Sequence, residues 1–259
     1  MLRLPLQLTA DLTRARLARM VRLAPDAGPV QFVDAAEILH HDSSHPVSHE
    51  RIREINSSRS PVVWIGGSEP LHHPGVSHLV RAIAQTGHFV FLETDGTNLR
   101  RRIHEFQPTS QLFLTVRLEP GAPRHTSKGL RSDTFELASE GTRAAGLSGF
   151  LICVNVRVHS ETKLQEMAEL IQFAHSLDVD GIVITRGNSG TNGAAPDAAA
   201  LQRKTAQARK LIGSRWWGSF SRILEPLLSG GRHAARSASD TGASVEQEER
   251  VNEEGVKVA

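Results

Sequence analysis

The stretch Val62-Val63-Trp64-Ile65-Gly66-Gly67-Ser68-Glu69-Pro70-Leu71-His72-His73-Pro74 decides the fold of this chain. Its first four residues are large and apolar, which predicts a short buried strand. The glycine pair that follows predicts a tight turn, and a helical pattern begins at about Gly75. A buried strand that leads through a turn into a helix is the repeating unit of parallel sheets. The stretch therefore predicts an α/β fold.

The same unit of apolar run, turn and helical pattern recurs along the chain. We expect strands at about Leu4–Thr9, Pro61–Ile65, His88–Leu92, Gln111–Leu118, Phe150–Val158 and Gly181–Thr185. Helices are expected at about Ser48–Asn56, Gly75–Thr86, Thr97–Glu105, Ser132–Ala145, Glu161–Leu177 and Ala198–Ile212. The segment Leu23–Val47 contains Gly28-Pro29 and the run HHDSSHP, so it is expected to be irregular. Six strand–helix units predict a partial (β/α)6 TIM-like barrel over residues 1–229.

Composition restricts the class of protein. The 259 residues carry a net charge of +2 and 39% hydrophobic residues, as a water-soluble globular protein does. No apolar run approaches the ~20 residues that cross a bilayer, and the amino terminus does not read as a signal peptide, so we expect a cytoplasmic protein. Arginines are interleaved with acids and no tyrosine is present, which argues against nucleic-acid binding. Residues 230–259 lose the large apolar residues and are expected to form a disordered tail.

The chain has one cysteine, Cys153, in the middle of an expected strand. A single thiol excludes an intrachain disulfide and a set of thiolate ligands for zinc or iron–sulfur within the chain. We expect Cys153 to be a small buried apolar residue. A second group that merits inspection for metal binding is His40, His41, His45 and His49, but Pro46 argues against one helix that presents them together. A solvated loop without metal is the favoured interpretation.

The turn Gly66-Gly67-Ser68-Glu69-Pro70 resembles the Gly-Gly-Glu-Pro turn of radical S-adenosylmethionine (SAM) enzymes, whose backbone holds the amino group of SAM. Further along, Thr94-Asp95-Gly96 resembles the family's Thr-Asn-Gly turn, with Asp95 in place of asparagine. Arg117 and Glu119 stand where the family has the serine and aspartate of a Ser-Leu-Asp-Gly strand end. The resemblance extends from about residue 4 to residue 187. It is closest to the hopanoid-biosynthesis group, which attaches the adenosyl radical to a hopene, in GFLICVNVRV and LDVDGIVITRG.

Members of that family ligate a [4Fe-4S] cluster through three cysteines, Cys-x3-Cys-x2-Cys, in the loop after the first strand. In the register of the resemblance, LPLQLTADLTRARLARM places Leu12, Arg16 and Arg19 at these positions. Leucine has no lone pair and a guanidinium is all donor, so none of the three binds iron. The resemblance therefore implies a barrel without the cluster, and at most SAM binding without radical cleavage.

Functional groups of such a barrel are expected at the carboxyl ends of its strands. Strand alternation puts Thr115, Arg117 and Glu119 on one inward face and Cys153, Asn155 and Arg157 on the next. The candidates at the mouth are Thr94, Asp95, Arg117, Glu119, Asn155, Arg157 and Arg186, with Arg16 and Arg19 in the loop above. So many guanidinium groups favour a phosphate or carboxylate ligand over a sulfonium. Alternatively, the arginines form ion pairs with Glu69, Glu93, Asp95 or Glu119, and the sequence leaves both interpretations open.

The leading hypothesis from sequence is a non-catalytic binding or accessory protein, with a small anionic ligand or a protein partner such as an intact barrel enzyme. A second hypothesis is an enzyme that acts on an anionic substrate, with Glu69, Glu119 or Asp95 as the acid–base group. Residual SAM binding through Gly66–Pro70 is the third.

Overall fold

The fold is described from a computed structural model. It describes residues 5–20, 28–38, 48–119, 133–159, 161–187 and 198–212, together with residues 224, 225 and 228. The expected tail at 230–259, the domain boundary before it, and three of the four histidines of the HHDSSH region, His40, His41 and His45, lie outside the described residues. The fourth, His49, is the first residue of a helix.

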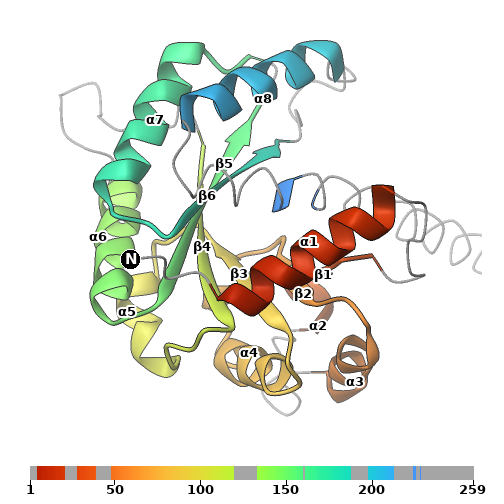
Figure 1. The fold of residues 1–259 in the computed structure, drawn as a ribbon. Helices are drawn as coiled ribbons and strands as arrows, with labels where there is room; N and C mark the ends of the chain where they lie inside the picture. The colour runs from red at the N-terminus through yellow and green to blue at the C-terminus, as the bar shows by residue number, and fades with distance from the viewer. Residues whose placement is uncertain are drawn as a thin grey trace, which may run out of the picture.

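Six parallel strands form one sheet whose spatial order is the order of the chain. They are β1 (Val30–Asp34), β2 (Val62–Gly66), β3 (Phe89–Thr94), β4 (Leu112–Leu118), β5 (Leu151–Val158) and β6 (Gly181–Arg186). Because every strand is parallel to its neighbour, all six carboxyl ends meet at one edge of the sheet. The sheet curves into a half-barrel (Figure 1), and the predicted partial TIM-like α/β fold is confirmed.

Helices cover the convex side of the sheet (Figure 1). They are α2 (Ala35–Ile38), α3 (His49–Ser57), α4 (Val76–Ala84), α5 (Leu99–Arg102), α6 (Asp133–Leu147), α7 (Leu164–Ser176) and α8 (Ala198–Ile212), with 3-10 turns η1 (Pro70–His72) and η2 (Ile103–Glu105). The crossover helices lie within a few residues of the predicted ranges. None of the helices that the structure describes is long and apolar enough to cross a membrane.

Alternation along the strands produces two separate apolar cores. The larger core lies between the sheet and the helices and takes the outward residues, including Ile65, Val116 and Val154. The smaller core lies on the concave side and is built on three aromatic rings from neighbouring strands. The rings of Trp64 and Phe91 stack with centroids 5.4 Å apart, and those of Phe91 and Phe113 with centroids 4.4 Å apart. Apolar side chains therefore fill the part of the concave face that lies away from the carboxyl ends of the strands.

The first helix, α1 (Leu6–Met20), lies on the concave side, opposite the other helices (Figure 1). Leu8 and Leu12, one helical turn apart, are fully buried against the aromatic layer. The prediction of a strand at Leu4–Thr9 is therefore wrong. The LPLQLT pattern also fits a helix, and Pro5, immediately before α1, is tolerated because the N–H groups at a helix start have no intrahelical acceptor.

The first strand is instead β1, inside the segment that was predicted to be irregular. Val30 and Val33 are buried there, and β1 pairs in register with β2 from Val30↔Val62 to Asp34↔Gly66. Pro29 immediately before the strand suggested a break, but proline is compatible with the start of an edge strand. This strand places Asp34 next to the glycine turn.

Candidate site at the carboxyl edge of the sheet

Glu69 joins the turns that follow β2 and β3. Its carboxylate accepts hydrogen bonds from the Thr94 hydroxyl (2.6 Å), the Asp95 amide (2.7 Å) and the Leu71 amide (3.1 Å). Burial raises the pKa of Glu69, and the hydrogen bonds from Thr94 and Asp95 lower it in part. Glu69 is therefore a structural link between two turns. Its carboxylate already accepts three hydrogen bonds from the chain, and these positions are not available to a ligand.

The two glycines of the turn leave room for carboxylates of the chain itself. A Cβ atom on Gly66 would lie 2.8 Å from Glu93 Oε2, and one on Gly67 would lie 2.5 Å from the Asp34 carboxylate. Gly67 also has φ of +83°, a backbone conformation that residues with a side chain rarely adopt. Next to them, Ser68 is exposed. The close approach that glycine permits here is thus used by Glu93 and Asp34.

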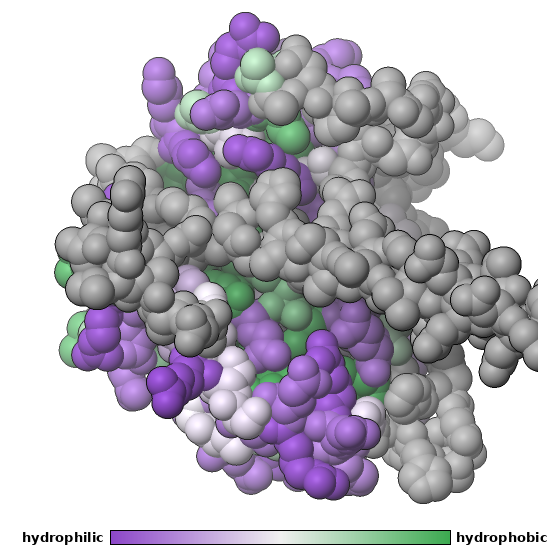
Figure 2. All heavy atoms as spheres, turned by 90° about the vertical axis from the view of Figure 1, so that its right-hand side faces the viewer, coloured by the Kyte–Doolittle hydropathy of each residue, from purple (hydrophilic) through white to green (hydrophobic). Residues whose placement is uncertain are grey.

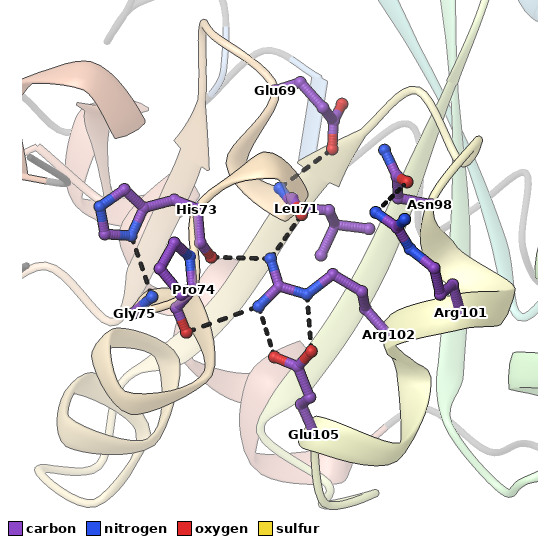
Figure 3. A network of polar contacts seen from close by, with 9 residues as sticks. All are labelled: Glu69, Leu71, His73, Pro74, Gly75, Asn98, Arg101, Arg102 and Glu105. Carbon is purple, nitrogen blue, oxygen red and sulfur yellow. Dashed lines mark hydrogen bonds and ion pairs between the residues drawn. The ribbon is translucent and has the colours of Figure 1, made fainter. Parts of the chain in front are cut away.

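Pro70 is buried at the start of η1, and the rest of this turn is held by Arg102 of α5 (Figure 3). Its guanidinium donates to the carbonyl oxygens of Leu71, His73 (2.8 Å) and Pro74 (3.5 Å), and it binds Glu105 through two nitrogens. These contacts satisfy a cation that is only 8% exposed.

Arg102 was missed at the sequence level, where LRRR looked uniformly basic. One signal was present, since Arg102 follows buried Leu99 by three positions and so shares its inward side of the helix.

Asp95, a predicted mouth residue, caps its own turn. Its carboxylate accepts hydrogen bonds from the Thr97 amide (2.8 Å) and the Thr97 hydroxyl (2.7 Å). The predicted residue Thr94 is buried and donates to Glu69. Both side chains therefore shape the turn after β3.

Above the aromatic layer, the concave face is polar and centred on Glu93. This carboxylate is 2% exposed and accepts hydrogen bonds from Trp64 Nε1 (2.8 Å), Asn155 Nδ2 (3.1 Å) and Arg157 (2.8 Å). The Thr185 hydroxyl donates to the side-chain amide oxygen of Asn155, Oδ1, at 2.7 Å. Arg157 therefore forms one of the ion pairs that the sequence left as an alternative to an anion site. Trp64 and Thr185 were not predicted as members of this group.

The other predicted rim residues differ in placement. Arg117 is half-buried on β4, in register with Asn155, whereas Glu119 is exposed just beyond the strand. Arg186 is exposed and pairs in register with Val158 of the outer core, so it lies on the other side of the sheet from Asn155. Among the described residues, neither Arg117 nor Arg186 has an ion-pair partner. Of the arginines predicted at the mouth on these strands, Arg117 and Arg157 share the concave face.

No family model matches the sequence. The chain is 29% identical over 126 residues to GTP 3',8-cyclase of Rhizobium leguminosarum bv. trifolii (strain WSM2304), which is 47% of this chain and 36% of that protein. Streptococcus suis SuiB bound to S-adenosylmethionine matches 77% of this chain and 48% of SuiB, with 13% identity and a TM-score of 0.54.

The chain has the fold of the radical SAM superfamily. Methylornithine synthase, PylB, is a further similar structure, with 14% identity and a TM-score of 0.48 over 79% of this chain and 68% of that protein. The chain spans about a third of the curated relative and about half of SuiB.

The radical SAM fold brings a correction to the expected cluster positions. Leu12, Arg16 and Arg19 belong to α1, which precedes β1, so they do not follow the first strand of the sheet. Leu12 is 1% exposed in the inner core and Arg16 is exposed. The register that placed these three residues after the first strand failed because that strand was assigned to Leu4–Thr9.

The donor set of the chain does not fit a radical SAM iron–sulfur cluster. The sequence contains one cysteine, and Cys153 is fully buried on β5, where burial raises the pKa of its thiol. Within the described ranges there is no group of three or more His, Cys, Asp or Glu side chains that could hold a metal ion. Three thiolates on one cluster are therefore beyond what this chain supplies.

Proposed function

We propose that this chain is a radical SAM-like protein that performs no radical chemistry and acts as a non-catalytic binding or accessory protein. One observation supports the proposal most directly. The spaces beside Gly66 and Gly67 are occupied by the carboxylates of Glu93 and Asp34. The finer resemblance to the hopanoid-biosynthesis group suggests that its partner is an intact barrel enzyme of that kind.

The concave face supports this proposal. Leu8 and Leu12 of α1 pack on the stacked rings, and Glu93 with its three donors fills the polar layer above them. The barrel implied by the resemblance has its functional groups at the carboxyl ends of the strands, on their inward faces. In this chain, its own side chains occupy much of that face.

Anaerobic iron–sulfur reconstitution tests the proposal directly. We expect no stoichiometric iron and no absorption at about 400 nm, where thiolate-bound clusters absorb. A Cys153→Ser variant is the matched control, since any iron retained equally by the variant is not bound through the thiol. A stoichiometric cluster in the purified chain would overturn the proposal.

A second candidate function is binding of a small anion between Arg117 and Arg157. The specific observation is that Arg157 Nε is buried without a hydrogen-bond partner and that Arg117 is half-buried without an ion-pair partner, both among the described residues. Two guanidinium groups on neighbouring strands suit a phosphate or carboxylate. Whether such a ligand is only bound or is also chemically changed decides between the binding protein and the enzyme hypothesis.

Thermal-shift measurements with inorganic phosphate, succinate and SAM separate these candidates. A ligand at ~100 times its Kd stabilises the fold by ~2.7 kcal/mol. Anion binding predicts a shift with phosphate or succinate that Arg117→Ala removes and Arg186→Ala, on the other side of the sheet, retains. A shift with SAM alone would support residual SAM binding. Equal shifts in both variants would contradict the anion site.

A further inference from the structure

Helix α1 has two apolar sides. Leu8 and Leu12 face the inner core, and Leu6, Ala10, Thr13 and Leu17 follow one another at spacings of four, three and four residues. Such spacings align side chains along one side of a helix. At 100° per residue this second row lies roughly opposite Leu8 and Leu12. The helix therefore presents, away from the barrel, a row of two leucines, one alanine and Thr13, whose hydroxyl donates to the Thr9 carbonyl oxygen of the same helix at 2.7 Å.

The outer row of α1 is accessible to solvent. Leu6 is 87% exposed and Leu17 is 57% exposed, which makes them two of the most exposed large apolar residues described. A shallow groove of about 660 Å³ runs along this side, and it is lined by Leu6, Thr9, Ala10, Thr13, Arg14, Leu17 and Ala18. A helix at a protein surface normally has a polar outer face, and apolar residues on both faces indicate a helix between two layers. Figure 2 views the molecule from the open side of the sheet, where hydrophobic side chains are visible among hydrophilic ones.

The order of residues in the outer row is symmetric about the point between Asp11 and Leu12. Ala10 and Thr13 are equally far from this point, and so are Leu6 and Leu17. An antiparallel second copy of α1 would therefore bring Leu6 against Leu17 of the second copy. At the centre, Ala10 would meet Thr13 of the second copy, and their small side chains allow the helices to approach closely. This is the self-complementary pattern of a two-fold interface.

The charges beside the row fit the same arrangement. Arg14 already binds Asp11 of its own helix at 3.0 Å. In the antiparallel pair it would lie on the same flank as Gln7 and Asp11 of the second copy, and Arg16 would lie beside Thr9. Arginines would not oppose arginines, so the pairing carries little like-charge repulsion.

We propose that the outer face of α1 is a homodimer interface in which two copies of the helix pack antiparallel. The proposal is independent of what the carboxyl edge of the sheet binds. A contact limited to four helical turns is smaller than the ~1,600 Å² of a standard interface, so the dimer is weak and forms with increasing concentration.

Sedimentation velocity of the full chain between about 1 µM and about 300 µM tests the interface. We expect the monomer to give way to a dimer, and Leu17→Glu to raise the dissociation constant by about tenfold or more. The double variant Leu6→Glu/Leu17→Glu stays monomeric. Leu147→Glu, which alters a 91% exposed leucine on α6, leaves the dimer intact and controls for loss of an exposed leucine.

Disulfide trapping tests the orientation. Chains carrying Ala10→Cys are mixed with chains carrying Thr13→Cys, and mild oxidation is expected to link the two kinds preferentially. The native Cys153 is fully buried and does not compete. A wild-type monomer at every concentration would overturn the proposal, as would a dimer that persists in the double variant. Linking no greater than with a Leu147→Cys control would overturn the antiparallel register.

Discussion

The guanidinium of Arg157 donates a hydrogen bond to the carboxylate of Glu93 at 2.8 Å, between β5 and β3 and across 64 positions of sequence. Glu93 is 2% exposed, and Trp64 and Asn155 donate to the same carboxylate. The pair is therefore the electrostatic centre of the polar layer on the concave face. Its strength depends on both partners, because a buried charge without its counter-charge is costly.

Glu93→Gln is expected to lower the free energy of unfolding by about 3 kcal/mol, since it leaves Arg157 without its anion in a largely desolvated place. Urea denaturation at pH 7 measures this change. The double variant Glu93→Gln/Arg157→Met should lose less than the sum of the two single variants, because no unpaired charge remains. Additive losses would show that the two side chains do not interact.

The strands from β2 to β6 were predictable because each is a run of apolar residues bounded by turn residues, as in Val62–Ile65. The first strand was not, because the five residues of β1 follow Gly28-Pro29 and LPLQLT fits a strand as well as a helix. The site was only partly predictable. The glycine turn has a local signal, whereas the contact of Arg102 with His73 links residues 29 positions apart and depends on packing.

Arg102→Ala is expected to destabilise the fold by about 3 kcal/mol, because it strips three carbonyl oxygens and Glu105 of their donor. Arg101→Ala is the matched control, since Arg101 is exposed and donates only to Asn98 among the described side chains. Thermal unfolding of both variants measures the difference. Equal effects would contradict the clamp.

The same clamp predicts a pH dependence. The hydrogen bond from Arg102 lowers the pKa of Glu105 below its ordinary value, so the ionised carboxyl stabilises the fold above its unfolded pKa. That contribution is lost as the pH falls through the folded pKa. The difference in Tm between the wild type and Glu105→Gln should therefore be largest above about pH 4.5 and should shrink below it. A difference that stays constant from pH 3 to pH 7 would show that the charge plays no part.

Glu69 is expected to change stability with pH in the opposite direction to Glu105. Burial raises the pKa of Glu69 in the fold, so the folded chain holds this proton more tightly than the unfolded chain, and stability is lost as the pH rises from the unfolded pKa through the folded one. Glu69→Gln removes this titration and should flatten the Tm curve above about pH 4.5. Glu119→Gln changes an exposed carboxyl beyond β4 and is the control. A wild-type curve that coincides in slope with Glu69→Gln would contradict the prediction.

A comparison of alanine substitutions at Gly67 and Gly87 tests whether the Asp34 carboxylate occupies the space beside Gly67. Both have positive φ, +83° and +97°, but a Cβ on Gly87 meets nothing within 4 Å, whereas one on Gly67 meets Asp34 at 2.5 Å. Gly87→Ala should therefore cost about 1 kcal/mol from backbone strain alone, and Gly67→Ala should cost about 1 to 3 kcal/mol more. Asp34→Gly in the Gly67→Ala background removes the clash and should recover that excess. Equal losses for both glycine variants in urea denaturation would mean that Asp34 does not occupy the space beside Gly67.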